Sequence, residues 1–240
     1  VAIGVAVPGP FQKTQGKIAL ITEMNNWLNI PLVDEFANAY SLPVIFEHDA
    51  NAGAFAEWWF GNQSKDGIGT LVYFLVGEGV GAGVLVNGDI FNGSQGIAGE
   101  IGHISVDVDG DKCKCGNHGC LELYSSSLAF VKHANSLLKD YPNSILNKCY
   151  KITADEIFNA ARQGDELALK LVKRAGRYIG YGIVTIVNAY DPNVVVVGNL
   201  MANGGELILK EAKAVVKERI LESIYENLDI VLSDFSTDPI

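Results

Sequence analysis

Three cysteines and a histidine lie close together in one short stretch of this chain. They are His103, Cys113, Cys115 and Cys120, and the chain's one other cysteine is Cys149. Three thiolates and one imidazole complete the ligand set of a closed, tetrahedral zinc ion. Because one ion would have to draw both ends of this segment together, the spacing constrains the local fold strongly. It predicts a structural zinc site that pins a loop and leaves no open position for water.

The same residues also allow alternatives to a zinc site. Ordinary buried or redox-active thiols seldom cluster so closely beside turn-forming glycines such as Gly116 and Gly119. Disulfide bonds are a weaker alternative, because pairing would leave an odd thiol and we expect no secretory signal. His118 is an alternative fourth ligand, but its place inside the short turn 115–120 favours His103. A zinc–thiolate site also favours a reducing compartment, so we expect a cytoplasmic protein.

Composition narrows the class of protein. The chain has 240 residues and a formal net charge of −10. This length suits two modest domains, and the excess of carboxylates opposes a broad nucleic-acid surface within these residues, although many soluble proteins are acidic. Apolar runs are short and interrupted, so we expect no membrane span. The strand-like start at Val1 and the end at Ile240 lead us to expect a fragment that lacks both termini.

Hydrophobic periodicity predicts an α/β architecture. A short strand at 18–21 is expected beside the first strand, and residues 77–83 are expected to form a glycine-rich loop. The polar stretch 61–67 is the expected boundary between a smaller domain, residues 1–66, and a larger domain, residues 67–240, that carries the zinc loop. The expected strands are 1–7, 44–46, 70–76, 84–86, 194–197 and 230–232, and the expected helices are 32–40, 50–60, 125–139, 153–162, 165–190 and 207–221.

Four motifs follow one another in a specific order. Residues 48–52 read HDANA at a predicted strand-to-helix junction, a frequent place for binding sites. The glycine-rich hairpin 77–83, the run GEIGH at 99–103 and the run CKCGNHGCLE at 113–122 come next. In this order the chain resembles the ROK family of repressors, open reading frames and kinases, over nearly its whole length. The resemblance implies a two-domain α/β fold like actin and hexokinase (ribonuclease H-like), with sugar bound between the domains, and a homodimer or tetramer.

On the sugar side, the resemblance assigns binding roles to His48, Asp49, Glu100, His103 and Glu122. In the family's kinases, the aspartate matching Asp49 is the general base toward a sugar hydroxyl, although such a carboxylate also simply binds sugar. The residue matching His48 is usually asparagine, a departure that we expect to alter sugar choice. Without the resemblance, Glu100 and Glu122 would be taken for solvated loop carboxylates. His103 is expected to bind zinc through one ring nitrogen and to face the sugar with the other.

The glycine-rich loop departs from the kinase pattern. Gly77, Glu78, Gly79 and Gly81 match the family's second phosphate-binding loop, but Glu78 stands where kinases carry a small hydroxyl residue. A carboxylate aimed at a triphosphate would repel it by several kcal/mol. The alternative is a plain hairpin bend with this carboxylate turned into solvent.

A second departure follows the predicted strand 194–197. The kinases have consecutive glycines there that leave room for adenosine, whereas this chain keeps Gly198 and adds side chains at Asn199 and Leu200. Two weakenings beside an intact sugar side favour the effector domain of a repressor of the xylose or N-acetylglucosamine type, with DNA bound by an upstream helix-turn-helix domain outside this chain. The alternative is an ATP-dependent sugar kinase of the glucokinase or hexosamine kinase type, with ATP, Mg²⁺ and Asp49 as base.

Overall fold

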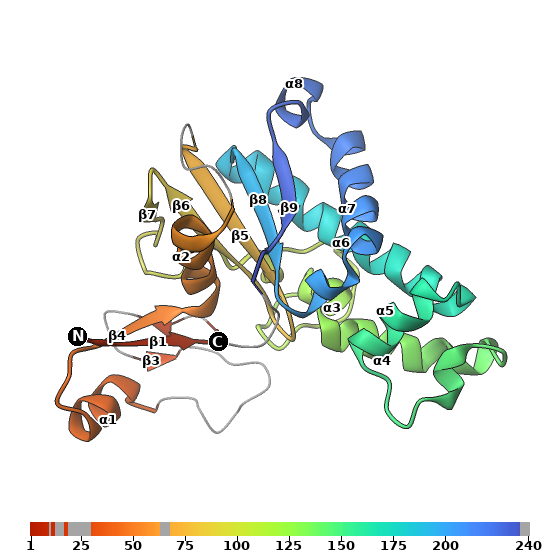
Figure 1. Cartoon of the computed structure of the whole chain (residues 1–240), viewed down its shortest axis with the longest axis horizontal. Helices are drawn as coiled ribbons and strands as arrows, with labels where there is room; N and C mark the ends of the chain where they lie inside the picture. The colour runs from red at the N-terminus through yellow and green to blue at the C-terminus, as the bar shows by residue number, and fades with distance from the viewer. Residues whose placement is uncertain (10, 13–16, 19–29, 63–67, 236–240) are drawn as a thin grey trace.

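The structure is a computed structural model that describes residues 1–9, 11–12, 17–18, 30–62 and 68–235. Its centre is a five-stranded mixed sheet in the order β7-β6-β5-β8-β9 (Figure 1). Strand β5 pairs antiparallel with β6 and parallel with β8, and β8 pairs parallel with β9. The α/β class expected from the sequence is confirmed. The bounds are β5 (Thr70–Val76), β6 (Val80–Val86), β7 (Asp89–Ile90), β8 (Val194–Gly198) and β9 (Asp229–Leu232).

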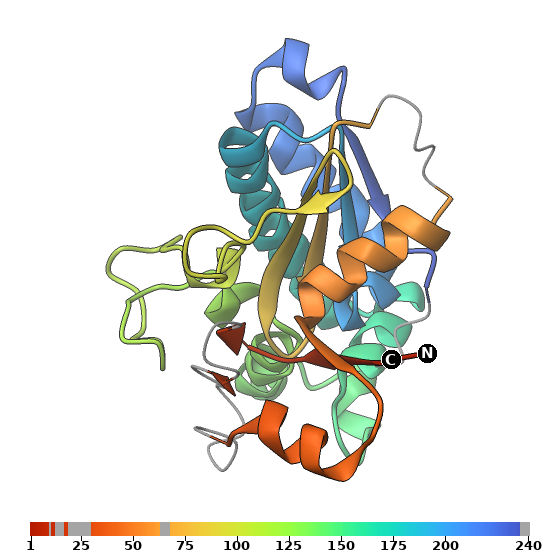
Figure 2. The same cartoon turned by 90° about the vertical axis from the view of Figure 1, so that its left-hand side faces the viewer.

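Helices cover both faces of this sheet, as Figure 2 shows. Strand β5 alternates between the two layers: Phe74 packs toward the α6 side and Tyr73 toward α2 (Asp49–Phe60). All five residues of β8 are buried, as expected for a strand covered on both faces. The helices on the α6 side are α3 (Glu122–Ser125), α4 (Ser127–Leu137), α5 (Ala154–Arg162), α6 (Glu166–Tyr190) and α7 (Glu206–Arg219), and α8 (Glu222–Tyr225) follows α7. The connections contain the 3₁₀ turns η2 (Ile101–His103), η3 (Leu138–Asp140), η4 (Ile145–Lys148) and η5 (Leu200–Gly204).

Side-chain caps set the helix boundaries on this side. Asp165 accepts a hydrogen bond from the Ala168 backbone N–H at 2.9 Å and starts α6, as predicted. The single helix expected at 125–139 is instead divided into α3 and α4. The division falls at Ser126, whose extended backbone ends α3 and whose hydroxyl caps α4. Within the described residues, no helix combines the length and apolar character that crossing a membrane requires.

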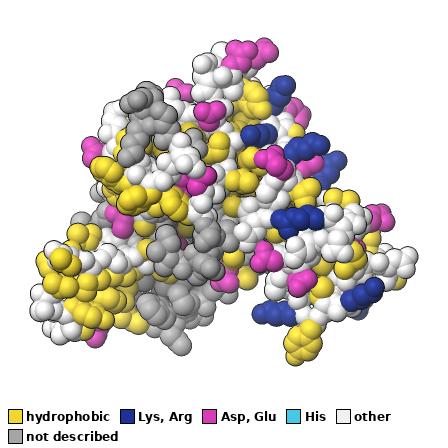
Figure 3. Space-filling view, viewed as in Figure 1, with side chains coloured by type: hydrophobic (Ala, Val, Ile, Leu, Met, Phe, Trp, Pro, Cys, Tyr) yellow, Lys and Arg dark blue, Asp and Glu magenta, His cyan; other side chains and the backbone are white. Residues whose placement is uncertain are grey.

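A smaller unit precedes the large sheet. It holds β1 (Ile3–Val7), β4 (Val44–His48) and α1 (Leu32–Ala39), with a short hairpin of β2 (Phe11–Gln12) and β3 (Lys17–Ile18). The prediction that residues 18–21 pair with the first strand is wrong for Ile18, because β1 pairs in parallel with β4, while β3 pairs with β2; residues 19–21 lie outside the described residues. Hydrophobic side chains gather on the surface at the α1 end of the molecule (Figure 3).

The predicted domain boundary at 61–67 lies mostly outside the described residues, since 63–67 are not among them. Helix α2 precedes this boundary yet packs on β5 and β6 through Ala50 and Ala54, both fully buried. By packing, α2 therefore joins the small unit to the large sheet. Its first residue, Asp49, follows directly after β4, which places the predicted HDANA motif where the two parts meet.

Candidate functional site

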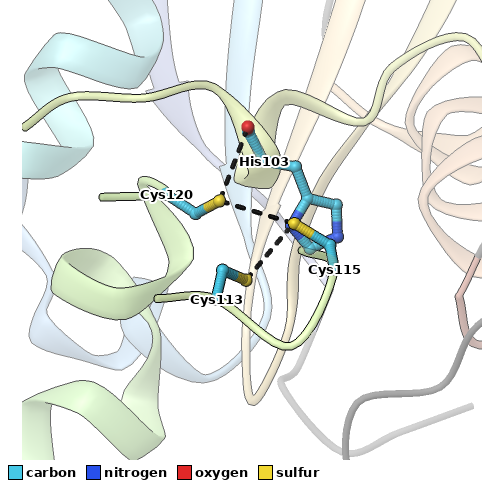
Figure 4. Close-up of side chains that lie close together, drawn as sticks. All are labelled: His103, Cys113, Cys115 and Cys120. Atoms are coloured by element: carbon cyan, nitrogen blue, oxygen red, sulfur yellow. Dashed lines mark hydrogen bonds between the residues drawn. The ribbon is translucent and has the colours of Figure 1, made fainter. Parts of the chain in front are cut away.

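The predicted metal ligands converge (Figure 4). One side-chain ligand atom from each of His103, Cys113, Cys115 and Cys120 lies within 4.8 Å of all the others. Cys115 Sγ is 3.6 Å from Cys120 Sγ, and Cys113 Sγ is 3.9 Å from His103 Nδ1. Ligand atoms around a tetrahedral zinc ion lie roughly 3.4 to 3.8 Å apart. These residues therefore fit a metal ion with small adjustments.

Backbone contacts shape the loop that carries these ligands. Isolated bridges join Ser105 to Cys120 and Lys112 to His118, and the Asn117 amide donates to the His103 carbonyl at 2.9 Å. The His118 ring lies apart from the four ligand atoms, with Nδ1 3.4 Å from the Gly110 carbonyl oxygen. The structure thus groups His103, and not His118, with the cysteines.

Burial affects the protonation of two of these thiols. Burial raises the pKa of Cys120 to about 12 and raises that of Cys113 above its usual value. Without a nearby positive charge, both sulfurs stay protonated at neutral pH. A bound divalent metal reverses this preference, since a coordinating thiol is deprotonated outright.

Three carboxylates form a second cluster beside the metal loop. Asp49 stands at the first position of α2, Glu100 just before η2, and Glu122 at the first position of α3. Burial, followed by the charges of Asp49 and Glu122, raises the pKa of Glu100 to about 7. Asp49 and Glu122 thus lie near enough to Glu100 for their charges to act on it. These are three of the five residues that the sequence assigned to sugar.

Backbone hydrogen bonds orient two of these carboxylates. Glu122 Oε2 accepts from the Val80 N–H at 3.1 Å, and Asp49 Oδ1 accepts from the Ala50 N–H at 2.7 Å. Burial raises the pKa of Asp49, and the neighbouring His48 opposes that rise. Both carboxylates are therefore held by regular structure, which limits their motion.

Two histidines complete the cluster. His48 Nε2 lies 3.2 Å from Asp49 Oδ1. His103 turns Nδ1 toward Cys113, while its Nε2 lies 3.9 Å from Glu100 Oε2. One imidazole ring thus joins the metal ligands to the carboxylates, which is how ligating histidines commonly couple a metal to its surroundings.

The glycine-rich loop is shorter than predicted. Residues Gly77–Gly79 make the turn, and β6 already begins at Val80, so Gly81 belongs to a strand and not to the expected loop. The turn is closed by a hydrogen bond from the Gly77 N–H to the Gly79 carbonyl, 2.9 Å, and fixed to α4 by the Ser127 N–H on the Gly77 carbonyl, 2.8 Å. Glu78 is exposed at its tip.

Asn199 lies against this turn. Its backbone has φ 68° and ψ −163°, a region that is nearly restricted to glycine. The side chain accepts a hydrogen bond from the Leu200 N–H at 2.7 Å, and a Cβ built on Gly77 would come 2.5 Å from its Oδ1. The sequence revealed the added side chain, but neither the unusual backbone nor the contact with Gly77.

Gly198 has a different neighbour. A Cβ at this position, or at Gly53 of α2, would clash with the ring of Tyr73. Burial, then Glu57 and Asp49, raises the pKa of Tyr73 to about 12. Sequence reasoning missed Tyr73, because nothing in a buried strand sequence marks which aromatic residue lies between two glycines.

Comparisons with known proteins agree with these features. The profile of the ROK family matches residues 1–238. A xylose repressor of Caldicellulosiruptor bescii is 33% identical over 234 residues, which cover 96% of this chain and 58% of the repressor. A solved ROK family transcriptional regulator, homologous to the MLC protein of E. coli, superposes with a TM-score of 0.87 at 29% identity and covers 99% of this chain and 59% of that one. A ROK glucokinase from Streptomyces griseus, solved with glucose and AMPPNP, gives 0.88 at 28% identity, with 98% and 77% covered. The chain therefore spans less than two thirds of the length of the repressors it matches.

Proposed function

The chain belongs to the ROK family, and we propose that it is the sugar-binding effector part of a sugar-responsive transcriptional repressor. Its α/β fold is of the actin and hexokinase type found in its relatives. In this proposal, sugar binds between the start of α2 and the metal-pinned loop, in the cleft between residues 1–66 and 67–240. DNA is bound by a helix-turn-helix domain outside the residues described. Asn199, lying against Gly77, is the observation that favours a repressor over a kinase.

The carboxylate cluster suits a polyhydroxylated ligand. Asp49, Glu100 and Glu122 offer acceptor oxygens around one space, and carboxylates accept hydrogen bonds from hydroxyl groups strongly. A neutral ligand that donates such bonds relieves the mutual repulsion of these groups without adding negative charge. His48, in contact with Asp49, adds a ring that shapes which sugar fits.

The metal loop holds this cluster in place. We propose zinc as its resident ion, because three sulfurs and one imidazole nitrogen are the donors that zinc prefers. All four ligands come from the protein, so the ion supplies rigidity and charge rather than an activated water. Because His103 Nε2 lies 3.9 Å from Glu100 Oε2, fixing the His103 ring also limits where Glu100 can move.

The side where the family's kinases bind nucleotide offers less space than the carboxylate cluster does. The Asn199 side chain fills the space beside Gly77 at the carboxyl ends of β5 and β8, where open α/β sheets usually bind ligands. Glu78, exposed at the turn, would also repel a triphosphate.

In this proposal, sugar acts by shifting the population of closed and open clefts, which changes how DNA-reading domains are placed.

A kinase is the second candidate, and the similarity to the Streptomyces griseus glucokinase favours it. In that case Asp49 would take the proton of the attacking sugar hydroxyl, with ATP and Mg²⁺ bound beyond the Gly77–Gly79 turn. Its place at the start of α2 suits that role as well as it suits simple binding.

Calorimetric titration with unphosphorylated pentoses, hexoses and amino sugars tests the proposal, followed by an ATP turnover assay with any sugar that binds. We expect binding without turnover in the wild type, and lost binding in Asp49→Asn. Turnover in the wild type that Asp49→Asn abolishes would establish the kinase instead. With the natural full-length polypeptide, the same sugar must also change the affinity for its operator DNA.

A further inference from the structure

His48 ends β4 and directly precedes Asp49, the first residue of α2. The family usually has asparagine at this position, so the imidazole ring is a feature of this chain. Its Nε2 lies 3.2 Å from Asp49 Oδ1, and the same oxygen accepts a hydrogen bond from the Ala50 N–H at 2.7 Å. An ionised carboxylate only accepts hydrogen bonds, so Nε2 must carry the hydrogen of this contact. Two donors therefore hold Oδ1, and a ligand would meet Asp49 through Oδ2.

The His48 ring is packed against β6 and against the segment before η2. A Cβ built on Gly81 would come 3.6 Å from the Cε1 atom of the ring and 4.0 Å from the Gly99 carbonyl oxygen. The Ala82 N–H donates to that carbonyl at 2.8 Å and ties the segment to β6. The ring therefore has little freedom to turn away from Asp49.

The two neighbouring side chains differ in exposure. The Asp49 side chain is 36% exposed, whereas the His48 side chain is 12% exposed. Most of the ring is thus covered by protein, and Asp49 is the group that a ligand would meet. Burial raises the pKa of Asp49 and His48 opposes that rise, because a donor or a positive charge beside a carboxylate favours its ionised form.

We propose that His48 is a positioning residue that acts on the sugar through Asp49. Its Nε2–H keeps Asp49 ionised and in one orientation, so that Oδ2 accepts a hydrogen bond from a hydroxyl group of the sugar. A carboxylate that is already held in its binding orientation loses less freedom when the ligand arrives. This role rests on the proposed function, and it concerns how the sugar site is held rather than which sugar fills it.

Other titratable groups face Asp49 from the elements around it. Burial, then Glu57 and Asp49, raises the pKa of Tyr73 on β5. Burial, then Asp49 and Glu122, raises the pKa of Glu100 before η2. A substitution of the neighbouring imidazole leaves all of these groups in place. A change in the titration of Asp49 then reports the loss of the imidazole itself.

Nuclear magnetic resonance of the Asp49 carboxyl carbon tests this role without a ligand. His48→Phe keeps a ring but removes the donor, so Asp49 should titrate at a higher pH than in the wild type. His48→Gln offers an amide N–H in place of Nε2–H and should restore the wild-type titration. His133→Phe, on α4, is the matched control and should leave the titration unchanged.

Calorimetry with D-xylose, D-glucose and N-acetylglucosamine tests the effect on binding. For a sugar that binds the wild type, we expect His48→Phe to weaken binding by roughly two- to tenfold at pH 7, the net contribution of one hydrogen bond. The loss should grow as the pH falls, because Asp49 of this variant becomes protonated at a higher pH. A residue with a purely structural role would weaken binding equally at every pH. His48→Gln should bind the sugar as the wild type does.

The nitrogen resonances of the wild-type His48 ring give a test that needs no variant, since the neutral ring should carry its hydrogen on Nε2. Hydrogen on Nδ1, an Asp49 titration or a sugar affinity that His48→Phe leaves unchanged, or a folded His48→Gln that restores neither, would each overturn this role. Failure of all three sugars to bind the wild type would instead contradict the proposed function. The Asp49 titration would still decide whether His48 positions this carboxylate.

Discussion

The proposed sugar side and the proposed nucleotide side of the site differ in their electrostatics and in their packing. On the sugar side, Asp49, Glu100 and Glu122 lie close enough that burial and mutual repulsion raise the pKa of Glu100 to about 7. On the nucleotide side, Asn199 is hydrogen-bonded and lies against Gly77. The repelling carboxylates thus lie where a ligand could donate hydrogen bonds to them or neutralise them, whereas the Asn199 side chain fills the space beside Gly77. Groups with perturbed pKa values cluster at functional sites.

The proposed metal site holds the loop that carries the sugar-side carboxylates. We therefore expect Cys113→Ser to have the largest effect of the variants considered. Loss of one ligand should remove bound zinc and lower the free energy of unfolding by roughly 4 kcal/mol or more, with loss of sugar binding. Metal analysis and denaturant unfolding measure both effects. Cys149→Ser is the matched control, because Cys149 lies outside the cluster. Wild-type protein without near-stoichiometric zinc would contradict the metal assignment.

The carboxylates come next. Glu122→Gln removes a carboxylate acceptor, and Glu100→Gln removes one that is roughly half ionised at pH 7. We expect each change to lower sugar affinity by about 1.5 to 3 kcal/mol, or at least roughly tenfold, in calorimetry. Glu78→Gln is the control on the nucleotide side and should leave sugar affinity unchanged. Unchanged affinity in both Glu100→Gln and Glu122→Gln would mean that the sugar site has been misplaced.

Two substitutions of Asn199 test the packing on the proposed nucleotide side. Glycine tolerates its backbone conformation, whereas alanine would keep the strain and lose the hydrogen bond to Leu200. We expect Asn199→Ala to be less stable than Asn199→Gly by about 1 to 2 kcal/mol, the reverse of the usual order in helices. Thermal unfolding of the two variants measures this difference, and sugar affinity should stay unchanged in both. Equal stability would contradict the strained conformation.

The smallest effect concerns Glu57, which shares α2 with Asp49. This side chain is 1% exposed, one of its oxygens has no hydrogen-bond partner among the described residues, and burial raises its pKa above the ordinary 4.5. The folded state therefore binds this proton more tightly, so stability falls as pH rises from 4.5 toward the folded pKa.

Glu57→Gln removes that fall, because glutamine does not titrate. We expect it to stabilise the protein at pH 7 and to leave stability unchanged at pH 4. Unfolding curves at both values measure the effect. Asp49→Asn is the contrasting variant: it also removes a buried carboxylate, but it should abolish sugar binding. A destabilised Glu57→Gln at pH 7 would mean that the charged form is the one the fold requires.

The sequence predicted most of the local structure and the metal cluster. Cysteine spacing marked the residues that could hold a metal, and Asp165 marked the start of α6, because both signals act over a few residues. It did not predict that β1 pairs with β4, since parallel partners are chosen by contacts distant along the chain. The place of Tyr73 between Gly53 and Gly198, and the contact of Asn199 with Gly77, likewise depend on how separate elements approach each other.

Titration of one wild-type preparation with sugars and with AMPPNP and Mg²⁺ tests the contrast between the two sides most directly. We predict that an unphosphorylated sugar binds, that the nucleotide gives no measurable heat, and that Glu122→Gln weakens the binding of the sugar alone. Nucleotide binding as tight as sugar binding, or nucleotide binding without any sugar binding, would contradict this contrast.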